Sequence, residues 1–163
     1  MMMRQDDPHK CTALKLVRFG LAQSIKFIPK KSLVLNPFSD IRLVKRDMLL
    51  SESVCVIDCS WEEAIKVWNQ KDTRIHGIDR RLPALLAANP INYAKLGKLS
   101  TAEALAGSHY ILGNVEMARN ITNKFKWGHT FLELNLNLLD DYAKADSSEK
   151  VMEIEKEYFP QLT

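Results

Sequence analysis

The chain has 163 residues, of which 46% are hydrophobic and 26% are charged, and its formal net charge is +3. This composition is that of a soluble globular protein and excludes a disordered or collagen-like chain. No apolar run approaches the roughly 20 residues of a membrane-spanning helix, and the start of the chain has no apolar segment typical of a secretory signal. We therefore expect a cytoplasmic protein with no membrane partner.

The positions of the charges, cysteines and histidines narrow the classes of ligand. Residues 1–126 carry eight more basic than acidic side chains, whereas residues 127–163 carry five more acidic than basic ones. The excess of basic side chains over residues 1–126 points to a polyanionic partner, but charged side chains on an ordinary solvated surface would explain it equally well. The odd count of three cysteines argues against a disulfide framework, and the four histidines are scattered singly, without metal-ligand spacing. We expect no bound metal.

The hydrophobic pattern and the helix-capping signals predict an α/β fold. A first helix is expected through Lys15 to Ala22. Short apolar runs that end at a breaker predict parallel strands covered on both faces, at residues 33–35, 54–57 and 84–87. Capping boxes and one amphipathic stripe predict the other helices, near residues 61–70 (cap Ser60), 101–112 (cap Ser100), 114–125, 131–144 (cap Thr130) and 147–158 (cap Asp146). We expect a small, basic, RNA-facing N-terminal lobe over residues 1–53, and a domain with a parallel sheet flanked by helices over residues 54–163.

Two clusters near the predicted strand ends and helix starts could carry chemistry. Thr12 could hold a ligand hydroxyl, although a helix-start threonine is the commoner role. In "VIDCSWEEA", Asp58 follows a buried strand and Trp61 falls in the first turn of the next predicted helix. A ligand there would meet an acid, an indole face and free helix N–H groups. A core tryptophan and a turn acid are the simpler explanation of the same residues.

The third cluster is the loop "NPINYAKLGKLSTAE", which follows the strand predicted at residues 84–87. Ligands of open α/β sheets bind outside the carboxyl ends of strands, but an ordinary connection is the alternative. The chain has no phosphate-loop or dinucleotide-binding glycine motif. Basic side chains around an exposed aromatic residue suit single-stranded or looped RNA. The residues expected to contact RNA are Arg46, Arg80, Arg81, Lys95 and Lys126.

Taken in chain order, five stretches resemble a known enzyme family: "DDPHKCTALKLVRFGLA", "VLNPF", "VIDCSW", "RLPALLAANPINYAKLGKLSTAEALAGS" and "FKWGHTFLELNLNLL". The chain resembles the small-subunit (16S/18S) ribosomal RNA aminocarboxypropyltransferases over nearly its whole length, and its size is typical of an archaeal member. The resemblance implies a SPOUT-like C-terminal domain with a trefoil knot, and we expect the protein to be a monomer. It also implies an enzyme that transfers the 3-amino-3-carboxypropyl group of S-adenosyl-L-methionine to N3 of an (N1-methyl)pseudouridine during ribosome biogenesis.

The resemblance also implies roles for individual residues. Trp61 and Ala64 would pack against the sulfonium methyl group, and Asp58 is our hypothesis for the group that helps to deprotonate the acceptor N3. The chain departs from the family pattern at Ala94 and Gly97, where glycine and an aromatic residue are commoner, and likewise at Ala13 and Leu96. The further residues expected to bind the cofactor are Thr12, Leu35, Pro37, Ile57, Leu82, Gly97 and Thr101.

Two other functions share these features. One is a SPOUT-type RNA methyltransferase, which would use the same cofactor and the same class of substrate. The other is a non-catalytic RNA-binding protein of ribosome assembly with a degenerate pocket.

Overall fold

The computed structural model describes residues 11–58 and 76–162. Within them, three parallel strands form one sheet in the order β2-β1-β3. The strands are β1 (Ser32–Leu35), β2 (Ser53–Val56) and β3 (Ile78–Arg80). The first two confirm the strands predicted from apolar runs, and β1, in the centre of the sheet, is buried along its whole length. The helix predicted over residues 61–70, with Trp61 and Ala64, lies outside the described residues.

The strand predicted over residues 84–87 is wrong: the third strand is Ile78–Arg80, and residues 84–87 make only an antiparallel bridge from Leu86 to Leu96. The segment is apolar, with Leu85 and Ala87 fully buried and the two other residues half-buried. Its polar backbone groups, however, are partly satisfied by side chains rather than by a neighbouring strand. Asn135 binds both the N–H and the carbonyl of Leu86, at 2.8 and 2.9 Å. The apolar composition therefore indicated correctly that the segment contributes to the core, but it did not indicate that a side chain, rather than a neighbouring strand, would bind its backbone groups.

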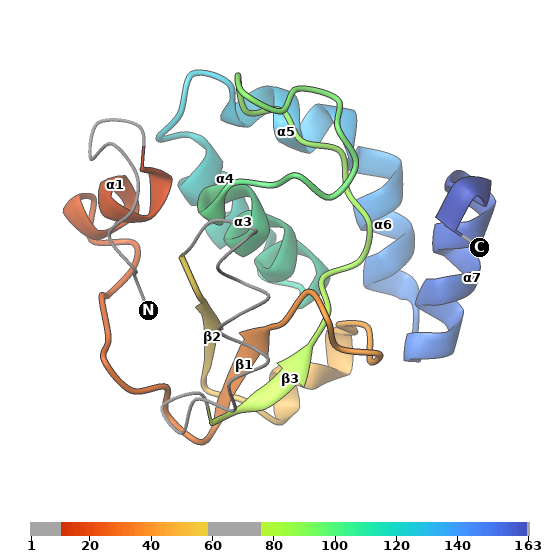
Figure 1. Cartoon of the computed structure of the whole chain (residues 1–163), viewed down its shortest axis with the longest axis horizontal. Coiled ribbons are helices and arrows are strands. Elements are labelled where there is room, and N and C mark those ends of the chain that lie inside the picture. The colour runs from red at the N-terminus through yellow and green to blue at the C-terminus, as the bar shows by residue number, and fades with distance from the viewer. Residues whose placement is uncertain (1–10, 59–75, 163) are drawn as a thin grey trace.

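In the view of Figure 1, the described α-helices lie above the sheet and to its left and right. Most begin close to their predicted positions, and the capping box of Ser100 and Glu103 is confirmed at the start of α3. The last helix is capped by Ser147 rather than by Asp146. The α-helices are α1 (Thr12–Arg18), α3 (Thr101–Ile111), α4 (Val115–Thr122), α5 (Gly128–Leu134), α6 (Leu136–Lys144) and α7 (Ser148–Tyr158), and the 3₁₀ helices are η1 (Lys45–Leu49) and η2 (Pro160–Leu162).

The single helix predicted over residues 131–144 is wrong, because the chain breaks into α5 and α6 at Asn135. Thr130 is not the cap either, since α5 already begins at Gly128. A Cβ atom at Gly128 would overlap the backbone of Thr122, so only glycine allows α5 to start this close to the end of α4. The wholly buried Asn135 turns its side chain to Leu86 and to the carbonyl of Phe131. The apolar stripe of the two helices is continuous enough to hide this break from a pattern analysis.

One large hydrophobic cluster joins the helices to the sheet and includes Leu16, Leu33, Leu85, Phe131 and Tyr142. The predicted boundary between residues 53 and 54 falls inside β2, after Ser53, and β2 pairs directly with β1, so residues on both sides of the boundary contribute to one sheet. The division into two domains stays a prediction. No helix in the described part of the chain is long and apolar enough to cross a membrane.

Candidate functional site

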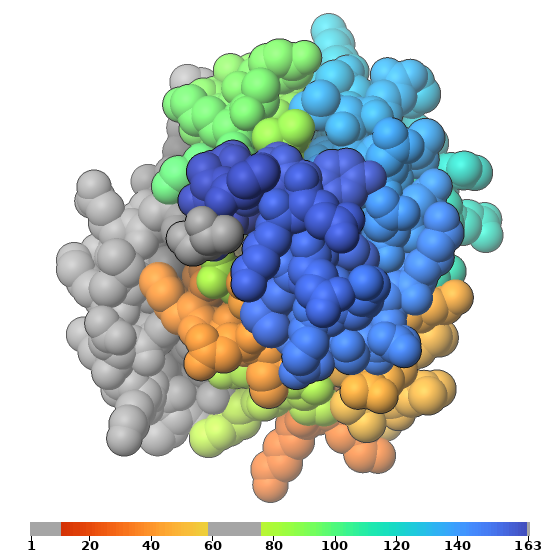
Figure 2. All heavy atoms as spheres, turned by 90° about the vertical axis from the view of Figure 1, so that its right-hand side faces the viewer, coloured from red at the N-terminus to blue at the C-terminus, as the bar shows by residue number. Residues whose placement is uncertain are grey.

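A cavity of about 570 Å³ lies where all three parallel strands end, which is the usual position of ligands in α/β sheets. Its walls come from the segments after β1, β2 and β3 and from the loop that leads into α3. Glu155 of α7 and Leu162 of η2 complete the lining. Figure 2 shows the end of the chain, in dark blue, lying between the green loop that precedes α3 and the orange segment that follows β1. The volume is typical of a site for a small molecule.

Most of the described residues expected to bind the cofactor come together in this cavity. They belong to four segments that are distant in sequence, and the strand ends bring them to one place. Thr12 is not among the residues that line the cavity. Its hydroxyl instead accepts a hydrogen bond from Ala102 N, near the start of α3, at 3.2 Å. Trp61 and Ala64 lie outside the described residues. The predicted cofactor-binding residues that line the cavity are Leu35, Pro37, Ile57, Leu82, Gly97 and Thr101.

Asp58 joins the first helix to the start of α3 beside this cavity. Its carboxylate accepts a hydrogen bond from the Thr101 hydroxyl at 2.7 Å and one from the Cys11 thiol at 3.4 Å. Burial raises the pKa of the Cys11 thiol, and the Asp58 carboxylate adds to this, so the thiol stays protonated and can donate. Cys11 Sγ in turn accepts from Leu14 N at the start of α1. Cys11, Asp58 and Thr101 therefore form one connected set of contacts.

A second cavity of about 130 Å³ adjoins the first, since Val56 and Thr101 line both. Asp58 lines this smaller cavity together with side chains of α1 and α3. His109 also lines it, and burial lowers the pKa of its imidazole, which favours the neutral ring. Asp58 itself is not among the described residues that line the larger cavity.

The loop between the buried segment and α3 is held by one carboxylate, that of Glu103, which is wholly buried. It accepts hydrogen bonds from the backbone N–H groups of Ala88 (2.6 Å), Asn89 (2.9 Å) and Ser100 (2.7 Å). The Asn89 side chain donates a fourth at 2.7 Å. The capping box in the sequence predicts only the bond from Ser100. Analysis of the sequence missed the other three, since nothing local pairs residue 103 with residues 88 and 89.

A second carboxylate fixes the opposite wall of the cavity. Glu155 of α7 accepts from Ala84 N at 2.8 Å and from Arg42 Nε at 2.9 Å. Arg42 N also donates to Ser148 Oγ at 2.8 Å, so α7 is tied to the segment after β1 as well as to the segment after β3. The charge pattern of the acidic C-terminal region indicated solvated side chains, and the burial of Glu155 was missed for that reason.

The basic residues expected to contact RNA have different environments. Arg80 pairs with the buried Asp47 at 2.9 Å, and its own side chain is only 15% exposed, so its guanidinium stabilises the fold. Arg81 is exposed at the rim of the main cavity, and Lys95 is exposed in the loop above it. Arg46 and Lys126 are also exposed. Among the described residues no three histidine, cysteine, aspartate or glutamate side chains gather as a metal site.

Comparison with known proteins identifies relatives over nearly the whole chain. A family model described as "Ribosome biogenesis protein, C-terminal" matches residues 33–159. The 16S rRNA aminocarboxypropyltransferase of Thermoplasma volcanium is 47% identical over 163 residues, which cover 98% of this chain and 96% of that protein. The enzyme of the same name from Methanosarcina acetivorans is 41% identical over 157 residues, covering 94% of this chain and 89% of that protein.

A solved structure agrees with these matches. The SAM-dependent rRNA:acp-transferase Tsr3 from Vulcanisaeta distributa superposes with a TM-score of 0.82 at 39% identity, covering 99% of this chain and 95% of that one. The resemblance found in the sequence motifs is thereby confirmed. This chain belongs to the family of 16S rRNA aminocarboxypropyltransferases.

Proposed function

We propose that this chain transfers the 3-amino-3-carboxypropyl group of S-adenosyl-L-methionine to small-subunit ribosomal RNA. The observation that carries the proposal is the cavity at the strand ends, which gathers cofactor-binding positions from four separate segments. The names of the relatives and of the structural neighbour support the same activity. Small-subunit rRNA, or the pre-ribosomal particle that contains it, is then the macromolecular substrate.

The lining of the cavity suits the adenosine part of the cofactor. Leu35, Leu82 and Leu99 supply apolar surface on which a purine can pack, and Thr101 supplies a hydroxyl. Gly97 has a φ of 71°, and a Cβ built there would meet no atom within 4 Å, so the loop leaves open space where a side chain would otherwise stand. Apolar walls with a few polar groups at fixed places are typical of such sites.

The proposed reaction is a nucleophilic substitution at the carboxypropyl γ-carbon. The acceptor N3 forms a bond to this carbon as the carbon–sulfur bond breaks, and the electron pair stays on sulfur in the leaving methylthioadenosine. N3 also loses its proton, for which Asp58 is the proposed acceptor. The walls of the cavity contribute by holding donor and acceptor in line, an effect that supplies up to about 7–11 kcal/mol in favourable systems. Trp61 and Ala64, on the basis of the resemblance, are proposed to cover the methyl group and so to select the transferred substituent.

The finer assignments belong to the same proposal. We propose an (N1-methyl)pseudouridine as the acceptor, a monomeric and cytoplasmic protein, no metal, and RNA contacts through Arg46, Arg81, Lys95 and Lys126. We also propose the SPOUT-like trefoil knot. Its support is the resemblance of the sequence motifs to the aminocarboxypropyltransferase family.

Position-specific isotope labelling tests the proposed function. The substrates are S-adenosyl-L-methionine labelled in the carboxyl carbon or in the methyl group, and small-subunit rRNA that lacks the modification. Only the carboxyl label is expected to appear on RNA. Transfer of the methyl label would instead identify a methyltransferase. Absence of both labels, together with no cofactor binding in calorimetry, would identify a non-catalytic RNA-binding protein.

The role of Asp58 is separable from its structural contacts. Asp58→Asn keeps an oxygen that can accept the hydrogen bond from the Thr101 hydroxyl, but the amide cannot act as a base. We therefore expect carboxypropyl transfer at saturating substrate concentrations to slow by about 100-fold or more. Thr101→Val removes the same hydrogen bond and leaves the carboxylate, and we expect it to weaken cofactor binding with a smaller effect on turnover. Single-turnover rates and calorimetry measure the two effects. Unchanged turnover in Asp58→Asn would show that Asp58 is not the proton acceptor.

A further inference from the structure

The loop above the cavity ends in a tip that exposes two large apolar side chains. Residues 85–97 form a hairpin, with Ala87 and Lys95 paired through their backbones and Leu86 bridged to Leu96. At its tip Ile91 is 75% exposed and Tyr93 is 60% exposed. These two side chains lie two residues apart in one short turn, and neither belongs to a hydrophobic core cluster.

The tip is held firmly in this position. Asn92 N donates to Asn89 Oδ1 at 3.0 Å, and Lys95 N donates to Asn92 O at 2.9 Å, so both flanks of Tyr93 are fixed. The next residue, Ala94, has a φ of 60°, a left-handed conformation that costs a non-glycine residue about 1–2 kcal/mol. Backbone strain of this kind persists where the surrounding contacts impose it, and it clusters at functional sites.

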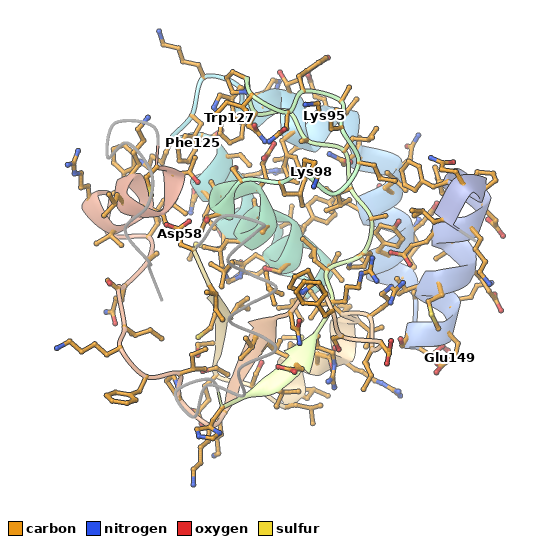
Figure 3. The ribbon with its side chains drawn as sticks, in the orientation of Figure 1. Asp58, Lys95, Lys98, Phe125, Trp127 and Glu149 are labelled. Carbon is orange, nitrogen blue, oxygen red and sulfur yellow. The ribbon has the colours of Figure 1, made fainter. Side chains whose placement is uncertain are left out.

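The position of the tip limits what it can bind. The hairpin returns directly into Leu96 and Gly97, which line the cofactor cavity, so a partner that reaches the cavity passes close to the tip. Its surroundings are basic: Figure 3 shows Lys95 and Lys98 on this same loop, above the sheet. Trp127, labelled on the same side of the molecule, already stacks on Phe125 at 5.0 Å and packs against the core. Tyr93 is therefore the exposed aromatic ring of this loop.

We propose that Tyr93 is a stacking platform for an unpaired base of the RNA substrate, next to the nucleotide that reacts, with Lys95 contacting the backbone phosphate. The inference rests on the proposed function, because it needs RNA to approach the cavity. A flat, exposed ring beside cationic side chains is the arrangement by which proteins hold splayed bases of single-stranded RNA. Stacking on such a ring contributes about 1–3 kcal/mol per base.

Binding of the full-length protein to a 12-nucleotide single-stranded RNA, and to the same RNA annealed to its complement, tests this platform. Tyr93→Ala should weaken binding of the single strand by about 5- to 100-fold, and Tyr93→Phe should stay within about twofold of the parent because the ring is kept. Binding of the duplex should change by less than about twofold in both variants, because paired bases cannot reach the ring. The affinity for S-adenosyl-L-methionine should not change.

Two matched controls separate stacking from a general loss of exposed apolar surface. Ile91→Ala removes an aliphatic side chain, even more exposed than Tyr93, from the same tip. Phe27→Ala removes an aromatic ring, 69% exposed, that precedes β1 at the opposite end of the strands from the cavity. Both should bind the single strand within about twofold of the parent. If Ile91→Ala or Tyr93→Phe weakens binding as much as Tyr93→Ala, or if Tyr93→Ala has no effect, the platform is disproved.

The outcome is independent of the labelling experiment. If Tyr93→Ala alone loses single-strand affinity while no carboxyl label is transferred by the parent, the platform stands and the proposed transferase activity fails. If the label is transferred with equal kcat/KM for RNA by the parent and Tyr93→Ala, the activity stands and the platform fails.

Discussion

Replacing Glu103 by glutamine is expected to lower the free energy of unfolding by about 2–4 kcal/mol and to weaken cofactor binding together with it. The carboxylate is wholly buried and accepts four hydrogen bonds, two on each oxygen. An amide in its place has one oxygen and one NH₂ group. Whichever way it is turned, its NH₂ faces two N–H donors, and each unsatisfied buried donor costs about 1–3 kcal/mol.

The cost should extend to the cavity because of where the donors lie. Ala88 and Asn89 hold the outgoing side of the 85–97 hairpin, and Ser100 is the residue at which α3 begins. The cavity-lining residues Leu96, Gly97 and Leu99 lie between these anchors. Loss of these hydrogen bonds should allow the loop to sample other conformations. The apparent affinity for the cofactor should then fall in proportion to the fraction of molecules that remain in the binding-competent conformation.

Denaturant unfolding and calorimetry with S-adenosyl-L-methionine measure both effects. Glu149→Gln is the matched control, because Glu149 also lies in the first turn of a serine-capped helix but is exposed, and Figure 3 shows it at the outer edge of the molecule. It should change the free energy of unfolding by about 0.5 kcal/mol or less. Equal stability of Glu103→Gln and Glu149→Gln would contradict the four-bond arrangement.

Much of the fold was predictable because its signals are local. β1 and β2 are short apolar runs ended by polar residues, and Ser100 and Glu103 form a capping box whose geometry is set within four residues. Local signals of this kind describe a single element and its face. The clustering of the cavity residues was predictable only through the family resemblance, since no local pattern states which strand ends meet.

What was missed depends on pairs that are distant in the chain. β3 has only three residues, "IDR", with an exposed aspartate in the middle, and becomes a strand because β1 offers it an edge. Glu155 and Asn135 both lie in regions with a helical pattern, which indicated roles on a helix face. Their partners are Ala84 and Leu86, 71 and 49 residues away. Periodicity carries no information about such partners.

Arg80 illustrates the same limit for function. A charged side chain beside a predicted ligand loop is equally compatible with a substrate contact and with an internal ion pair. Its ion-pair partner, Asp47, lies 33 residues away in η1, which the sequence does not predict, and is 2% exposed. An arginine that compensates a buried carboxylate has a structural role whatever else it does, because the carboxylate cannot stay charged and buried without it.

Replacing Asn135 by aspartate is expected to lower the free energy of unfolding by about 3–5 kcal/mol. The amide donates to the carbonyls of Leu86 and Phe131, each at 2.9 Å, and accepts from Leu86 N at 2.8 Å. A carboxylate keeps the acceptor but places a second oxygen against two carbonyl oxygens. It also introduces a charge at a position with no exposed surface. A buried, uncompensated charge costs several kcal/mol.

The pH dependence distinguishes this explanation from a simple packing defect. A carboxyl group without a cationic partner is forced toward its neutral form by burial, so its deprotonation opposes folding at neutral pH. The deficit of Asn135→Asp relative to the parent should therefore shrink as the pH falls from about 7 to about 4, where the neutral acid can again donate one hydrogen bond. Asn114→Asp, at the exposed cap of α4, where aspartate serves as well as asparagine, should show no deficit at either pH. A deficit in Asn135→Asp that is the same at both pH values would mean that lost packing, and not the buried charge, determines the cost.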